Sequence, residues 1–189
     1  FLIRMGANKH VHVVKYSPLL DRVVVADGDN FKRIWLSSRM ESFDIRKPDW
    51  ELKNRFHIQM GGYTAVVESG GKVFFGTDYQ GGTNFMVEST DGRAFKKLVV
   101  PDPYRRSPID NMLVRRSKRG GEIWANLPFA AGSSKCLLMV SADDGSTWNR
   151  VFEYSRSAHT VWLINSSNGP TQEVYVLVAD QKNNTRVVY

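Results

Sequence analysis

The fold prediction starts from one segment, Ser141-Ala142-Asp143-Asp144-Gly145-Ser146-Thr147-Trp148. Its residues suit a tight turn, because an Asp carboxylate accepts hydrogen bonds from backbone amides and Gly adopts a positive φ at no steric cost. The Ser hydroxyl offers a second local hydrogen bond, and the final Trp is expected to pack between sheets. We therefore interpret Ser141, Asp143, Gly145 and Trp148 as structural residues of a turn.

A shortened copy of this motif lies upstream, Ser89-Thr90-Asp91-Gly92-Arg93-Ala94-Phe95. In this copy the matching positions are Ser89, Asp91, Gly92 and Phe95. A degenerate version, Ser37-Ser38-Arg39-Met40-Glu41-Ser42-Phe43, lies further upstream. Each copy falls between the third and fourth strands predicted for a group of strands. A motif that recurs in register with repeated strands indicates a repeat architecture.

Short runs of β-branched and aromatic residues, separated by Gly, Asn, Asp and Pro, dominate the chain and predict strands. The runs fall into four groups with a period of about 45–50 residues. The expected strands are 10–16, 22–26, 32–37 and a weak 42–45; 63–68, 72–77, 84–88 and 95–99; 111–116, 122–126, 135–141 and 149–154; and 160–165, 173–179 and 185–189. Only residues 49–54 suit a short helix.

This pattern predicts an all-β fold, a β-propeller with four-stranded antiparallel blades. Residues 1–189 are interpreted as a single propeller domain or fragment, with blades at about residues 8–46, 61–100, 109–154 and 158–189. A β-sandwich has strands at a similar spacing, but it does not predict one motif at the same point of successive units. The recurrence of the turn motif therefore favours the propeller.

The segment Ser-x-Asp-x-Gly-x-Thr-Trp at residues 141–148 resembles the Asp box of bacterial neuraminidase repeats, the mark of the sialidase-like β-propellers. That family includes sialidases, other glycoside hydrolases, polysaccharide lyases, glycan-binding modules and non-catalytic propellers. The resemblance implies that the Asp box is a folding element away from the active face. It also implies a ring of five to eight blades, so we expect the chain to be part of a larger ring. The alternative is that residues 1–4 supply a missing strand and close a small ring.

The charge balance favours an acidic partner, because the formal net charge is +7. No nucleic-acid motif accompanies the basic residues, so nucleic acid is not expected as a partner. No apolar run is long enough to insert into a membrane. The single cysteine, Cys136, provides neither an intrachain disulfide nor a metal-ligand spacing. No cofactor is expected.

Propeller geometry indicates where a site is to be sought. The first strand of each blade is antiparallel to the second, so the start of the first and the end of the second lie at the same end of the sheet. The residues expected there are polar, and acid–base chemistry is assigned to four of them: His10, Asp78, Asp110 and His159. Substrate binding is assigned to seven more residues at or near this end: Asp27, Asp29, Tyr63, Tyr79, Arg105, Arg106 and Arg156.

Alternation along a strand places His10 and His12 on one face. A His-x-His pair binds metals in some proteins, but two ligands alone are a weak signal, and no metal is assigned. The aspartates also fit ordinary turns, as in Asp27-Gly28-Asp29-Asn30. The sequence alone does not decide whether these aspartates belong to a binding site or to ordinary turns.

The function predicted from these observations is recognition of an anionic carbohydrate, outside the cell or on a cell or virion surface. Whether the protein also cleaves the carbohydrate, as a sialidase-like glycoside hydrolase, is left open. The first alternative is a non-catalytic receptor-binding or scaffold propeller of the phage-tail or adhesin type, within a larger assembly. The second is a polysaccharide lyase that uses His and Tyr as base and acid. The arginine set and the Tyr–Glu nucleophile pair of sialidases have no assignable counterpart here.

Overall fold

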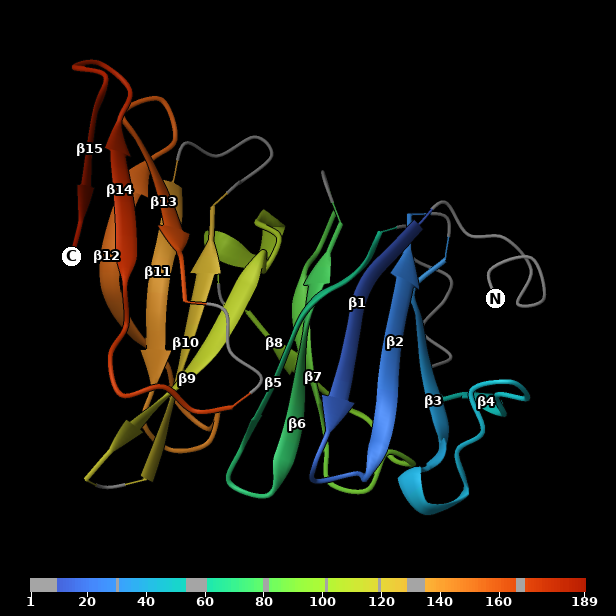
Figure 1. Ribbon diagram of the computed structural model, residues 1–189. Helices are drawn as coiled ribbons and strands as arrows, with labels where there is room; N and C mark the ends of the chain where they lie inside the picture. The colour runs from blue at the N-terminus through green and yellow to red at the C-terminus, as the bar shows by residue number, and fades with distance from the viewer. Residues whose placement is uncertain are drawn as a thin grey trace.

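The chain folds into four antiparallel sheets that follow one another in chain order (Figure 1). This computed structural model describes residues 10–29, 31–53, 61–79, 82–100, 102–118, 120–128, 135–165 and 169–189. Residues 1–4, the alternative closing strand, lie outside the described residues. The prediction of an all-β fold with four groups of three or four strands is confirmed. Within the described ranges, no helix has the length and apolar character needed to cross a membrane.

The first sheet has the strand order β1-β2-β3-β4. Its strands are β1 (His10–Ser17), β2 (Arg22–Gly28), β3 (Arg33–Arg39) and β4 (Trp50–Leu52). Two predictions were wrong here. Residues 42–45 form no strand, and the first of them, Ser42, ends a single 3-10 turn, η1 (Met40–Ser42). Residues 50–52, in the segment expected to suit a helix, form the fourth strand instead, because pairing with β3 outweighs a weak local preference.

The second sheet contains β5 (Gly62–Ser69), β6 (Lys72–Asp78), β7 (Phe85–Ser89) and β8 (Lys96–Val99) in that order. The third has β9 (Asn111–Ser117), β10 (Gly120–Leu127), β11 (Lys135–Ser141) and β12 (Asn149–Ser155). A 3-10 turn, η2 (Tyr104–Arg106), lies in the connection between them. Three strands of the fourth sheet are described: β13 (His159–Leu163), β14 (Val176–Asp180) and β15 (Thr185–Val188).

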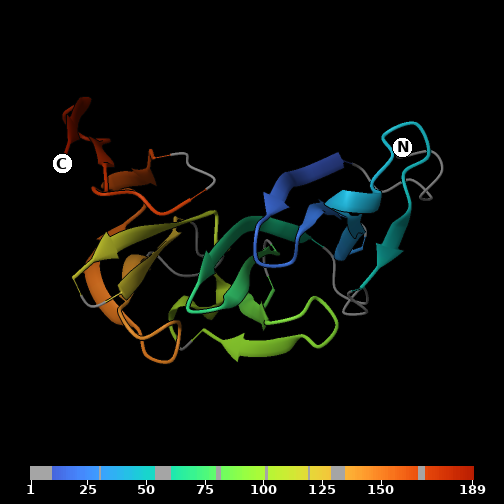
Figure 2. The same cartoon turned by 60° about the horizontal axis from the view of Figure 1, so that its bottom comes forward.

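The first strands of neighbouring sheets lie side by side (Figures 1 and 2). Between β1 and β5, the Lys15 ammonium donates to the Val66 carbonyl over 2.9 Å, and the Ser17 hydroxyl donates to Glu68. Between β9 and β13, the Asn111 amide donates to the Leu163 carbonyl over 2.8 Å. Side-chain hydrogen bonds therefore tie the sheets together along their first strands.

The core is divided into layers between neighbouring sheets. One layer joins the first two sheets through Val24, Ile34 and Leu36 on one side and Phe75 and Phe85 on the other. A second layer joins the next two sheets; its buried residues include Val67, Phe74, Met86, Ile123, Leu127 and Leu137. Smaller clusters around Leu163 and Val161 join the third sheet to the fourth. Each sheet therefore buries apolar side chains against its neighbours, and this burial stabilises the stack.

Segment 141–148 forms a tight turn between β11 and β12. The Ser141 hydroxyl accepts the Gly145 N–H over 2.9 Å, and Asp143 accepts both the Thr147 N–H and the Thr147 hydroxyl, over 2.8 and 2.6 Å. Gly145 has φ +80°, a conformation open to Gly at little cost. Trp148 packs against the core layer between the second and third sheets.

Segment 89–95 forms a similar turn between β7 and β8. The Ser89 hydroxyl accepts the Gly92 N–H over 3.0 Å, and Asp91 accepts the N–H groups of Arg93 and Ala94 over 2.7 and 3.0 Å. Gly92 has φ +67°, and Phe95 packs against the layer between the first and second sheets. We call residues 89–95 and 141–148 the Ser–Asp–Gly turns.

Both Ser–Asp–Gly turns press their glycine onto the preceding sheet. A Cβ added at Gly92 would lie 2.7 Å from Leu36 of the first sheet, and one added at Gly145 would lie 2.6 Å from Phe74 of the second. The second turn also reaches back through Asp144, which accepts a hydrogen bond from the Ser69 hydroxyl over 2.8 Å. The turns thus set the spacing of successive sheets at one end of the molecule, which we call the turn end.

Candidate functional site

The opposite end, where the first strand of each sheet begins and the second strand ends, we call the first-strand end. Antiparallel pairing places the following residues opposite each other there: His10 and Gly28, Gly62 and Asp78, Asn111 and Asn126, and His159 and Asp180. The third strands run from this end toward the Ser–Asp–Gly turns, so the two features lie at opposite ends of the sheets. The polar residues predicted for a site therefore belong to one end of the molecule.

His10 and His12 lie together at the start of β1. The register between β1 and β2 shifts between Val11 and Val13, so His12 is the extra residue of a β-bulge. Bulges redirect side chains and are common next to functional sites. The two imidazole rings stack in parallel, with centroids 4.4 Å apart. The His10 side chain is 59% exposed and that of His12 only 5%, so one ring faces solvent while the other is enclosed.

Asp29 joins the two histidines from the end of β2. Its carboxylate lies 3.0 Å from His10 Nδ1 and 3.6 Å from His12 Nε2. Its backbone has φ +84°, which non-glycine residues rarely adopt. Paired backbone hydrogen bonds with Gly61, of 2.9 and 3.1 Å, hold this conformation. The first sheet is therefore tied to the second at the point where Asp29 meets the histidines.

Two glycines make room for the His12 ring. A Cβ added at Gly28 would lie 2.8 Å from His12 Nε2, and one added at Gly62 would lie 2.7 Å from His12 Cε1. Burial, and then the neighbouring His10, lower the pKa of His12 despite the carboxylates nearby. The enclosed imidazole of His12 is therefore biased toward its neutral form, in which one ring nitrogen carries a lone pair.

Asp78, at the end of β6, brings a second carboxylate to this group. Burial raises its pKa, and the Asp29 carboxylate raises it further, whereas His12 and Lys32 lower it. Asp78 thus interacts electrostatically with residues of the first sheet as well as its own. The structure therefore brings together His10, Asp29 and Asp78, three of the residues predicted for the site.

Lys32 is a member of this group that the sequence did not predict. Its side chain is fully buried, with Nζ 4.9 Å from the ring centre of Phe85 and 5.5 Å from that of Tyr79. Burial lowers its pKa to about 8, while Asp78 acts in the opposite direction. Lys32 directly precedes β3, and no local pattern signals its burial, because the enclosing rings belong to another sheet.

The segment that carries Asp78 and Tyr79 is held by a buried amide. Asn84 accepts the Tyr79 N–H over 2.8 Å and donates to the Tyr79 carbonyl over 3.0 Å. The Thr77 hydroxyl donates to the same Asn84 oxygen over 3.1 Å. Tyr79 remains half-buried, with its ring against Gly82. Asn84, which the sequence did not single out, therefore positions two of the predicted residues.

Two predicted substrate-binding residues are corrected to structural ones. Asp27 is 1% exposed, and its carboxylate receives hydrogen bonds from Arg33, over 2.5 and 3.0 Å, and from Trp35 over 3.3 Å. Tyr63 is fully buried in the core, where its ring meets that of Phe75 edge-on. Neither side chain offers a surface to a ligand arriving from solvent.

The remaining predicted residues lie at the first-strand end but are spread over its width. The carboxylate of Asp110, just before β9, interacts electrostatically with that of Asp78. His159 lies on the fourth sheet, opposite Asp180 and edge-on to Phe152. The structure does not bring His159 into the group formed by His10, Asp29 and Asp78.

Three arginines lie on connections that lead to this end. Arg105 and Arg106 belong to η2, before β9, and Arg156 lies in the turn before β13. Arg105 is half-buried, with its guanidinium 3.0 Å from the Asp102 carboxylate, whereas Arg106 and Arg156 are exposed. The exposed pair adds positive charge at the rim of the first-strand end.

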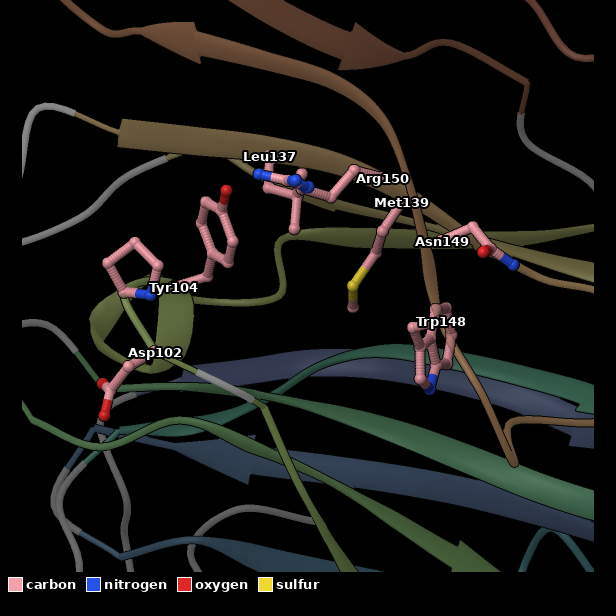
Figure 3. A pocket seen from close by; sticks show the side chains of 8 residues that line it. Asp102, Tyr104, Leu137, Met139, Trp148, Asn149 and Arg150 are labelled. Carbon is pink, nitrogen blue, oxygen red and sulfur yellow. The ribbon is translucent and has the colours of Figure 1, made fainter.

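A separate groove of about 280 Å³ lies beside the third sheet (Figure 3). Tyr104, Met139 and Trp148 line it together with Arg150. Trp148 belongs to a Ser–Asp–Gly turn, and the Tyr104 hydroxyl donates to Glu153. The groove follows from the packing of the turn and of η2, and it does not include the histidine and aspartate group.

The sequence matches no protein-family model, and no curated protein is significantly similar to it.

Proposed function

We propose that the four sheets are successive blades of a β-propeller of the Asp-box kind. Two observations support this. In Figure 2 the first strands of the sheets lie toward one side and the last strands point outward, as in blades around an axis. The Ser–Asp–Gly turns occupy the same place in two successive sheets and contact the preceding sheet in the same way. In this account the chain is one portion of a larger ring or assembly.

We further propose that the first-strand end recognises an anionic carbohydrate. The observation that carries the proposal is the convergence of His10 and Asp29 with Asp78 across the border of two sheets. Carboxylates accept hydrogen bonds from sugar hydroxyls, and imidazole both donates and accepts. Pockets in which a few polar groups converge are the usual places for ligand binding.

The preference for an anionic sugar rests on charge. The chain has a formal net charge of +7, and Arg106 and Arg156 are exposed at the rim of this end. Guanidinium groups bind carboxylates and sulfates through paired hydrogen bonds. Acidic glycans of this kind are found outside cells, so the proposal places the protein outside the cell or on a cell or virion surface.

Binding is tested by titrating the protein with sialosides and acidic polysaccharides at low and high salt. We expect saturable binding that weakens as salt is added, since exposed charges are screened within about 10 Å at 0.1 M salt. Asp78→Asn and the double variant Arg106→Ala/Arg156→Ala should weaken binding. The matched control is Asp44→Asn, because Asp44 follows β3 at the turn end, away from the group.

The same mixtures show whether a reaction follows binding. Released sugar without new unsaturation indicates a hydrolase, unsaturated products indicate a lyase, and binding without either indicates a recognition module. All three outcomes keep the first-strand end as the binding surface if Asp78→Asn weakens binding. Equal binding by Asp78→Asn, the arginine double variant and the wild type would overturn the choice of this end.

A further inference from the structure

His10, His12 and Asp29 bring three metal-ligating groups to one point. One ligand atom from each side chain, an imidazole nitrogen or a carboxylate oxygen, lies within 4.8 Å of the other two. In the part of the chain that the structure describes, this is the one group of three such side chains found this close. Two imidazoles and one carboxylate form a common ligand set for zinc and other divalent transition metals.

A second observation points to a ligand at this place. The side chain of His12 is 5% exposed, and its Nε2 atom is buried without a hydrogen-bond partner. The nearest carboxylate oxygen, from Asp29, is 3.6 Å away, beyond ordinary hydrogen-bonding distance. Buried polar atoms are nearly always satisfied in native proteins, so a buried and unpartnered nitrogen requires an explanation.

We propose that His10 Nδ1, His12 Nε2 and the Asp29 carboxylate bind one divalent transition-metal ion, of which Zn²⁺ is the representative. The ion satisfies the buried nitrogen of His12 and replaces its long contact with Asp29 by two short bonds to the metal. Three protein ligands leave a tetrahedral ion one open position, which water or an oxygen of a ligand fills. The site lies at the first-strand end, where β1 begins, and it opens to solvent at the His10 side chain, which is 59% exposed.

The geometry requires a small adjustment of one side chain. With metal–nitrogen bonds of about 2.0–2.1 Å, ligand atoms of a tetrahedral zinc lie roughly 3.3 Å apart. The contacts of Asp29 with the two histidines, 3.0 and 3.6 Å, bracket that value. The parallel stack of His10 on His12 does not direct both nitrogens at one point, so His10 must rotate out of the stack. Its exposure leaves room for that rotation.

The other two ligands are already fixed. Gly28 and Gly62 lie against the His12 ring so closely that a Cβ at either position would clash with it, and Asp29 is tied through its backbone to Gly61. Preorganised ligands lose little conformational entropy on binding. The carboxylate of Asp78, which acts electrostatically on His12, adds negative charge beside the cation. The two imidazoles and the Asp29 carboxylate thus supply the ligands, and Asp78 contributes only through its charge.

The experiment is a zinc titration of the full chain, after treatment with a chelator, by calorimetry and in the absence of any carbohydrate. Titration with Co²⁺ adds a visible absorption band that reports tetrahedral nitrogen and oxygen ligands. We expect one ion per chain. His10→Ala, which removes an exposed ring, and Asp29→Asn, which keeps the side-chain shape, should each weaken binding by at least about 100-fold, because loss of a residue that only hydrogen-bonds to a metal ligand already changes affinity 10- to 100-fold.

The matched control is His159→Ala. His159 also stands at the start of a first strand with an aspartate opposite, Asp180, but among the described residues no second histidine joins them in a group of ligating atoms. We expect its zinc affinity to stay within about twofold of the wild type, well below the 10- to 100-fold losses expected when groups that support a metal site are removed. Zinc binding that is equally strong in His10→Ala and the wild type, or no saturable binding by the wild type, would overturn the proposal. Neither result bears on carbohydrate binding, which is measured separately.

Discussion

Replacing Gly145 by Ala tests how the Ser–Asp–Gly turns hold successive sheets together. Gly145 has φ +80°, and a Cβ at this position would lie 2.6 Å from Cε1 and 3.1 Å from Cζ of Phe74. Phe74 is fully buried in the layer between the second and third sheets, so its ring has little freedom to move aside. The substitution therefore adds both backbone strain and a steric clash.

The structure offers a control that isolates the clash. Gly71, in the β5–β6 hairpin, has φ +71°, and an added Cβ would meet no atom within 4 Å. Both substitutions pay about 1–2 kcal/mol for placing Ala in a left-handed conformation. In Gly145→Ala, overpacking adds a further cost of about 1–3 kcal/mol. We therefore expect it to lower the free energy of unfolding by about 1–3 kcal/mol more than Gly71→Ala does.

Urea denaturation measures this difference, with the midpoint shifting and the slope of unfolding free energy against urea staying constant. A second variant tests the named contact, since Phe74→Leu removes the ring atoms that the new methyl group meets and leaves a shorter side chain. Combined with Gly145→Ala, it should lose less than the sum of the two single losses. Equal losses for Gly145→Ala and Gly71→Ala would show that the turn does not press on the second sheet.

Three further results are expected. Burial lowers the pKa of Lys32 to about 8, so on raising the pH the folded chain releases this proton before the unfolded chain does. The free energy of unfolding should therefore rise between about pH 8 and 10.5. Lys32→Met should remove about 3 kcal/mol of that rise, measured by urea denaturation across this pH range. Hydrogen bonds from Thr147 lower the pKa of Asp143, so Asp143→Ala should be less stable than wild type at pH 7, and the difference in melting temperature should vanish as the pH falls well below 4. Asp27→Ala removes the carboxylate that pairs with Arg33, whose side chain is 12% exposed, and should lower the free energy of unfolding by about 3–5 kcal/mol. A loss near zero would show that this ion pair does not stabilise the fold.

The strand pattern and the turn motif predicted much of the fold because both depend on local chemistry. The hydroxyl of Ser141 and the carboxylate of Asp143 bind groups within the same turn, so the turn could be identified from neighbouring residues alone. The fourth strand of the first sheet was misplaced because Trp50–Leu52 is extended through pairing with β3, a contact between segments separated in sequence.

Three of the residues proposed for the site, His10, Asp29 and Asp78, come together at one end of the sheets as expected, but the sequence did not indicate that Lys32 and Asn84 lie beside them. The rule that first strands start where second strands end brought His10, Asp29 and Asp78 to one end. The face of each side chain was less predictable, because a bulge of one residue changes which side of the sheet the neighbouring residues occupy. The register shift between Tyr63 and Ala65 accompanies the burial of Tyr63, which the sequence did not indicate.

Contacts between residues of different strands could not be predicted from the sequence either. His10 and His12 alternate along one strand, but the third member of their group, Asp29, follows a different strand and meets them only in the folded sheet. In the same way, the sequence around Asp27 fits a turn, but in the folded sheet Arg33 of the neighbouring strand donates a hydrogen bond to its carboxylate. Pairing across a sheet therefore decides which aspartate stays available to a ligand.

Hydrogen–deuterium exchange with and without a bound acidic oligosaccharide tests the central claim most directly. The claim is that the two ends of the sheets differ in role, with binding at the first-strand end and structural turns at the other. We predict slower exchange on binding around His10, Asp29 and Asp78, with no change in the Ser–Asp–Gly turns at residues 89–95 and 141–148. Protection confined to those turns, with unchanged exchange around His10 and Asp78, would contradict the account.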